Sequence, residues 1–215
     1  MKDHLIRRYS MFLCGVIISA CGIAFVTRAG LGTSPVSGLP FVLSLITEPS
    51  MGVYTFIFNM IYLAMEAMIR RRFTFVEAIQ ILIAVFFSLC IDFFMAMIPT
   101  RYGGPWMSSL VYLLIGCAVM AFGISFEVMA DVIMLPAEAL VRAISNKYNR
   151  AFGNTKVLFD STLTLIAVVI ALISFHKLNG VREGTIFNAL VVGQLVKLYT
   201  KLLQPMKRAW LGTEE

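Results

Sequence analysis

Charged residues within apolar stretches are the residues of this sequence most suited to chemistry. Asp92 and Lys197 each lie inside a long apolar run. Charges within a membrane are costly and often functional, so a buried Asp92–Lys197 pair could bind a proton or a cation, or hold two halves of the molecule together. Alternatively, Asp92 lies near the outer end of its helix, and the Lys197 side chain extends to the membrane surface.

A second set of polar residues lies near the ends of apolar runs. Asn59 and Asp160 each follow a phenylalanine, and Asp160 either favours a helix N-terminus or faces a central cavity. Glu66, one helical turn before Arg70, is interpreted as interfacial.

An acidic series follows in the middle of the chain. Glu127, Asp131 and Glu138, with Arg142, could line a cytoplasmic vestibule, and a solvated amphipathic face explains them equally well.

The most distinctive local pattern is the stretch Gly-Leu-Gly-Thr-Ser-Pro at residues 30–35, directly after Arg28 and Ala29. Gly30 and Gly32 allow positive φ angles. Thr33 or Ser34 can cap a helix that begins at Pro35. Backbone N–H groups at such a helix start attract an anion or a polar group. The pattern therefore predicts either a half-helix terminus that lines a solute site or a capped helix start after a tight turn.

Taken together, these patterns give the candidate substrate-binding residues Arg28, Gly30, Gly32, Thr33, Ser34, Asn59, Asp92, Asp131, Glu138, Asp160 and Lys197. No histidine lies inside an apolar run, and no nucleophile–base pair or metal-ligand spacing is present. We therefore expect no enzyme activity, no catalytic residue, no metal and no cofactor. The basic residues lie between apolar runs and form no nucleic-acid motif, so we expect no nucleic-acid partner.

The composition indicates which elements must position these residues. Of 215 residues, 59% are hydrophobic and 14% are charged, against roughly 25% charged residues in soluble domains. The mean hydropathy is +0.85. A soluble chain could not bury so much apolar surface, so the lipid bilayer is the expected surrounding of most of the chain.

Six apolar runs are long enough to cross a membrane as helices, so we predict an all-α membrane protein. They are residues 10–27, 51–69, 75–98, 107–126, 157–175 and 185–203. Two shorter segments, 30–47 and 129–147, are interrupted by glycine and proline or by charges. Each is predicted to be a short broken or re-entrant helix that enters the membrane or lies on it.

Positive charges predict the orientation. With six spans and a cytoplasmic N-terminus, most Lys and Arg residues fall inside, including the cluster at residues 70–72, and an eight-span arrangement would place that cluster outside. We therefore expect both termini in the cytoplasm.

The two halves of the chain align at a shift of 101 residues. About 11 of the 45 positions from 15 to 59 are identical, including Gly15 with Gly116 and Pro35 with Pro136. Three spans in each half require the second half to enter the membrane from the opposite side, which predicts an inverted repeat. The predicted halves are residues 1–104, with the broken segment 30–47, and residues 105–215, with the broken segment 129–147, in one integrated membrane domain.

The stretch at residues 30–35 resembles the YczE/YyaS/YitT group of bacterial integral membrane proteins. The six-run plan and the weaker second copy at residues 131–136 fit this resemblance, and the short tail resembles YczE-like members, which lack a soluble C-terminal domain. The resemblance implies a bacterial inner-membrane location and no particular substrate. The second copy departs from the motif, because the counterparts of Gly30, Gly32, Thr33 and Ser34 are Asp131, Ile133, Met134 and Leu135. Any site is therefore expected to be asymmetric.

These features predict a small transporter or permease for a small polar or anionic solute. Its site would lie near the midplane, between residues 30–35 and 131–136. A chain of this size is expected to need a homodimer or a partner membrane protein. Two alternatives stay open: a solute-capturing subunit that works with an energising partner, and a non-transporting assembly or regulatory factor.

Overall fold

The computed structural model describes residues 2–71, 74–100, 105–176 and 179–205. Within these residues all regular secondary structure is α-helix, which confirms the all-α prediction. The helices are α1 (Lys2–Arg28), α2 (Pro35–Ile46), α3 (Met51–Arg70), α4 (Phe75–Met97), α5 (Trp106–Ala130), α6 (Pro136–Lys147), α7 (Phe152–Phe175) and α8 (Glu183–Leu202). The predicted boundary at residue 104, the end of the C-terminal tail, and the orientation charges Arg72, Arg101, Lys177, Lys207 and Arg208 lie outside the described residues.

Five of the described helices are long and apolar enough to cross a membrane: α1 from Leu5 onward, α3, α4, α5 and α7. The helix α8 has 20 residues, but it carries Glu183, Lys197 and Lys201 and is less apolar. The sixth span therefore stays a prediction. Large apolar side chains, among them Leu89 on α4 and Leu158 on α7, are exposed on the outside of the molecule, as expected of helices that face lipid.

Local sequence signals explain where several helices begin. Ser34 caps α2, whose first residue is Pro35. The Ser50 hydroxyl accepts the Val53 N–H at 3.2 Å and caps α3. Thr74 and Glu77 form a capping box at the start of α4. The two predicted broken segments thus contain the 12-residue helices α2 and α6, each beginning at a proline.

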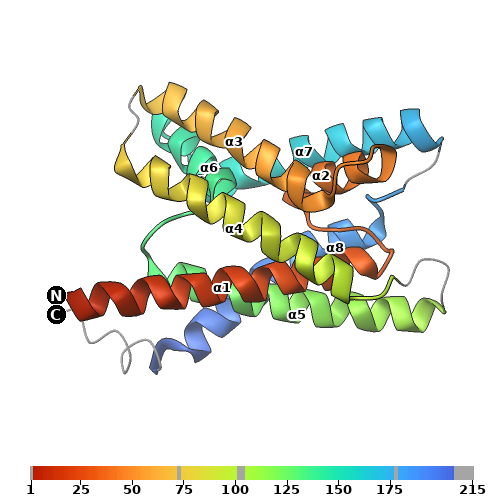
Figure 1. Cartoon of the computed structure of the whole chain (residues 1–215), viewed down its shortest axis with the longest axis horizontal. Coiled ribbons are helices and arrows are strands. Elements are labelled where there is room, and N and C mark those ends of the chain that lie inside the picture. The colour runs from red at the N-terminus through yellow and green to blue at the C-terminus, as the bar shows by residue number, and fades with distance from the viewer. Residues whose placement is uncertain (1, 72–73, 101–104, 177–178, 206–215) are drawn as a thin grey trace.

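The helices form two groups that lie side by side (Figure 1). In the first group α1 packs along α5, α4 packs on α1, and α8 packs on α5. In the second group α2 packs on α3 and α7, and α6 packs on the same two helices. The α3–α4 contact joins the groups, whereas α7 and α8 make little contact within the described residues. We refer to these as the α1/α5 group and the α3/α7 group.

Glycines bring α1 and α5 close together. A Cβ atom added at Gly15 would lie 2.8 Å from the Gly123 carbonyl oxygen, and one at Gly22 would lie 2.3 Å from the Met120 nitrogen. Small residues permit such close helix approach in membranes. The stripe of Gly15, Ser19 and Gly22 therefore serves helix packing.

Candidate functional site

The segment at residues 30–35 is packed against the start of α8. The Thr33 N–H donates to the Thr185 hydroxyl at 3.2 Å. The Gly184 N–H donates to the Leu31 carbonyl at 2.8 Å, and the Arg182 guanidinium donates to the Gly30 carbonyl at 3.2 Å. The segment is therefore held by hydrogen bonds to one neighbouring helix end.

The side chains of this segment are buried and bonded to one another. The hydroxyl groups of Thr27 and Thr33 lie 2.7 Å apart. The Ser34 hydroxyl donates to the Ser37 hydroxyl at 2.9 Å and accepts the Ser37 N–H at 3.4 Å. Gly32 has a φ angle of +124°, and a Cβ atom there would lie 2.5 Å from the Thr185 hydroxyl. These contacts match a capped helix start after a tight turn.

Arg28 also contacts protein atoms at the end of another helix. Its Nε donates to the Met95 carbonyl at 3.1 Å, and a second guanidinium nitrogen donates to the same oxygen. In this structure Arg28 therefore joins the end of α1 to the end of α4.

The second segment, residues 131–136, borders a cavity of about 300 Å³. Its lining comes from α3, α4, α5, α6 and residues 131–135, so the cavity lies between the α1/α5 group and the α3/α7 group. We call it the interbundle cavity. Its lining residues are Glu66, Arg70, Val76, Gln80, Glu127, Val128, Asp131, Val132, Ile133, Met134, Leu135, Glu138, Ala139 and Arg142.

Carboxylates outnumber basic groups in this lining. Two carboxylates, Glu66 and Glu127, are largely buried, and Asp131 and Glu138 are more accessible. Arg70 is engaged: its Nε lies 3.1 Å from Glu66 Oε1, and its Nη1 lies 3.9 Å from Glu77 Oε1.

Two buried acceptor atoms of the lining have no hydrogen-bond partner: Glu66 Oε2 and Gln80 Oε1. Glu66 is 1% exposed and Gln80 is 2% exposed. The Gln80 amide nitrogen donates to the Met134 carbonyl at 3.0 Å, which fixes the orientation of the amide. No protein group of the described chain therefore occupies these two acceptors, and both can receive a hydrogen bond from a molecule in the cavity.

Glu127 has a partner from the other long helix of its group. The Ser19 hydroxyl donates to Glu127 Oε1 at 2.7 Å. This bond holds the Glu127 side chain at the α1–α5 interface, and the end of α5 forms one wall of the cavity.

The structure brings part of the predicted site together. Asp131 and Glu138 line the interbundle cavity with Glu127 and Arg142, in the grouping that the vestibule interpretation requires. The residues of the 30–35 segment do not line it. Asn59 is buried on α3, and Asp160 pairs with Lys156 at 3.1 Å one turn earlier on α7.

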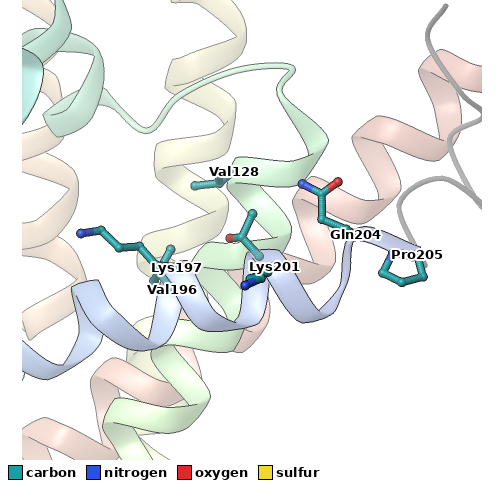
Figure 2. A pocket seen from close by; sticks show the side chains of 7 residues that line it. Val128, Val196, Lys197, Lys201, Gln204 and Pro205 are labelled. Carbon is teal, nitrogen blue, oxygen red and sulfur yellow. The ribbon is translucent and has the colours of Figure 1, made fainter.

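Asp92 and Lys197 lie in different surroundings. Asp92 accepts the Ser50 hydroxyl at 2.5 Å and the Gly52 N–H at 2.7 Å, so it stabilises the start of α3. Lys197 lines a surface groove of about 950 Å³ between α5 and α8, with Val128, Val196, Thr200, Lys201, Gln204 and Pro205. Figure 2 shows the extended Lys197 side chain at the end of the groove opposite Pro205. No ion pair joins Asp92 to Lys197 among the described residues.

Sequence reasoning missed three residues of the cavity. Glu66 was assigned to the interface, and Arg70 and Gln80 were not proposed for any site. One signal was available for Glu66, because it follows Asn59 by seven residues and Tyr62 by four, which places all three on one buried helix face. Nothing in the sequence marked Gln80, whose role depends on the position of α4 beside Met134.

Comparison with known proteins identifies the relatives of this chain. The model of the family of unknown function DUF6198 matches residues 6–201. The uncharacterized protein YyaS of Bacillus subtilis (strain 168) is 22% identical over 198 residues, which cover 92% of this chain and 94% of that protein. The uncharacterized membrane protein YczE of the same organism is 24% identical over 150 residues, 68% of this chain and 67% of that protein. No solved structure matches.

These relatives confirm the resemblance to the YczE and YyaS proteins. Together with the five apolar helices, they identify a multi-pass membrane protein. Since the family model spans most of its length, the chain belongs to the DUF6198 family.

Proposed function

We propose that the chain is a small-solute transporter or permease of the bacterial inner membrane, with both termini in the cytoplasm. Its six spans would form two inverted three-helix repeats. The observation that carries the proposal is the interbundle cavity, because it lies between two helix groups beside an interrupted helix and contains buried acceptors without partners. Transport sites of inverted-repeat proteins have this position.

Helix packing supports the inverted repeat. The α1–α4 contact corresponds to the α5–α8 contact, and the α2–α7 contact corresponds to the α6–α3 contact. The repeat-related glycines also contact one another crosswise, because Gly15 approaches Gly123 and a Cβ atom at Gly116 would lie 3.0 Å from the Gly22 carbonyl oxygen. A pseudo-two-fold axis between α1 and α5 would relate these two crosswise contacts to each other.

The two interrupted segments are also held by corresponding partners. Thr185 on α8 accepts the Thr33 N–H, and Gln80 on α4 donates to the Met134 carbonyl. Met134 follows Thr33 by 101 residues, and Thr185 follows Gln80 by 105, in line with the longer loop before α8.

This correspondence suggests a transport cycle. In the present state α3 packs along α4, α7 and α8 make little contact in the described part of the chain, and the cavity borders the 131–136 segment. During transport the two halves would exchange conformations. The 30–35 segment would leave α8 and open a second access route, while the access route at the 131–136 segment would close. The bonds from Thr33, Gly184 and Arg182 would break in that step.

Uptake by reconstituted vesicles tests the proposal. The protein, with Cys14, Cys21, Cys90 and Cys117 replaced by alanine, would be incubated with labelled cationic, anionic and neutral solutes. In the Thr33→Cys/Thr185→Cys variant, oxidation should join the 30–35 segment to α8, and uptake should fall to background and return after reduction. Loss of free thiols checks the cross-link, and the two single-cysteine variants are the controls.

The outcomes separate the proposal from its alternatives. Uptake that is unaffected by a verified cross-link contradicts the proposed cycle. Solute binding without uptake by the unmodified protein contradicts transport and favours a solute-capturing subunit that needs a partner. Neither binding nor uptake favours an assembly or regulatory factor.

A further inference from the structure

The polar atoms without partners in the interbundle cavity indicate the chemistry of its ligand. Because the Gln80 amide nitrogen is bound to the Met134 carbonyl, the unpartnered atom is Oε1, which only accepts hydrogen bonds. Glu66 Oε1 is bound to Arg70, and its Oε2 has no donor. Both positions therefore lack a donor.

The charge of the lining agrees with this. Besides the Glu66–Arg70 ion pair and the Glu127 carboxyl group, which accepts the Ser19 hydroxyl, the lining carries Asp131 and Glu138 against Arg142. Arg70 is shared between Glu66 and Glu77 and is therefore not available to an anion. A cavity with an excess of one sign of charge and apolar walls concentrates ligands of the opposite sign.

The geometry favours an organic cation over a metal ion. No three His, Cys, Asp or Glu side chains of the described chain come close enough together to hold a metal. The volume of about 300 Å³ accommodates a small organic molecule. Val76, Ile133 and Ala139 supply apolar walls for its carbon atoms.

We infer that the interbundle cavity binds a small organic cation, whose ammonium or guanidinium group donates to Glu66 Oε2 and Gln80 Oε1. Glu138 adds negative charge at the same wall. The inference rests on the proposed function, because it names the class of the transported solute. It replaces the anionic solute expected from the 30–35 segment, whose Thr33 and Ser37 N–H groups are bonded within the protein.

Binding to the full-length, detergent-purified protein tests the inference separately from transport. The probes are chloride salts of butylammonium and methylguanidinium, potassium butyrate, and neutral butyramide, compared at equal ionic strength. The cations should raise the apparent melting temperature in a saturable manner, because a ligand of the folded state stabilises it. Calorimetric titration then gives the Kd.

Two variants and a matched control locate the site. Glu66→Gln and Glu138→Gln should each raise the Kd of the cations about tenfold, equivalent to ~1.4 kcal/mol. Glu48→Gln makes the same chemical change at an exposed position between α2 and α3 and should leave the Kd unchanged. If the buried Glu66→Gln variant fails to fold, the more accessible Glu138→Gln variant still gives the test.

Several results would overturn the inference: stabilisation by butyrate or butyramide but not by the cations, no cation-dependent change at millimolar concentration, or an unchanged Kd in folded Glu66→Gln and Glu138→Gln proteins. Cation binding that depends on these residues but produces no vesicle uptake would support the cation site and contradict the proposed function. Uptake of butyrate by the vesicles would support the proposed function and contradict the cation site.

Discussion

The 30–35 and 131–136 segments have a similar backbone course but different surroundings. Each leaves a long helix through a residue with positive φ, Gly30 at 75° and Asp131 at 45°, and each leads to a proline at the start of a 12-residue helix. The first segment is bonded to α8 through backbone groups and buried hydroxyls. The second borders a charged cavity with acceptors that have no donor. A distinctive sequence can therefore mark tight packing, while its divergent copy borders the cavity.

The largest effect is expected from a side chain at the tightest point of the packed segment. Gly32→Val introduces a β-branched residue at φ +124°, where a Cβ atom would lie 2.9 Å from the Thr185 nitrogen. Backbone strain and the clash should together cost at least about 3 kcal/mol and prevent recovery of folded protein, measured as the yield of monodisperse protein in detergent.

The matched control places the same residue in the other segment. Ile133→Val, at the counterpart of Gly32, should cost about 0.5–1.5 kcal/mol and leave the protein folded. Equal yields of the two variants would contradict the difference between a packed and an open segment.

A smaller effect should follow from the loss of one hydrogen bond on each side. Thr185→Val leaves the buried Thr33 N–H without an acceptor, which should destabilise the protein by about 1–3 kcal/mol. Gln80→Leu removes the bond to Met134 but also an acceptor that has no donor, so its cost should be smaller. Thermal unfolding in the absence of solute measures both, and a larger loss in Gln80→Leu would refute the assignment of the unpartnered amide oxygen.

The smallest effect is expected from exchanging the residue types at positions 30 and 131, which both have positive φ angles. Asp131→Gly replaces an exposed residue at φ 45° by one that adopts this angle freely, so stability should rise or change by less than about 1 kcal/mol. Gly30→Asp places a carboxylate in a buried turn and should lower stability. If the unfolding temperatures of the two variants move together, the surroundings of the segments are not as different as described.

The helical architecture could be predicted from the sequence because it depends on local patterns. Long apolar runs and Ser34 before Pro35 act within one helix or one turn. The second broken segment was predicted over residues 129–147, and α6 begins within it at Pro136, the counterpart of Pro35. The sixth predicted span, residues 185–203, is not among the five apolar helices of the described chain, because Lys197 and Lys201 reduce the apolar character of α8.

The candidate site was harder to predict because it depends on contacts between distant helices. Asp92 was interpreted either as a member of a buried pair with Lys197 or as a residue near the outer end of its helix; its carboxylate binds the start of α3, 40 residues away in the sequence. Gln80 and Glu66 gain their environment only when α3, α4 and α6 meet. A charge in an apolar run therefore indicates that a partner exists and leaves open which helix supplies it.

Thiol labelling at the two corresponding positions tests the difference between the segments most directly. Glu138 lines the interbundle cavity, and its counterpart Ser37 is 6% exposed on α2. In a protein whose native cysteines have been replaced by alanine, a charged, membrane-impermeant thiol reagent should modify Glu138→Cys rapidly and Ser37→Cys slowly. Labelling of Ser37→Cys as fast as, or faster than, Glu138→Cys would contradict an open cavity at 131–136 and a closed segment at 30–35.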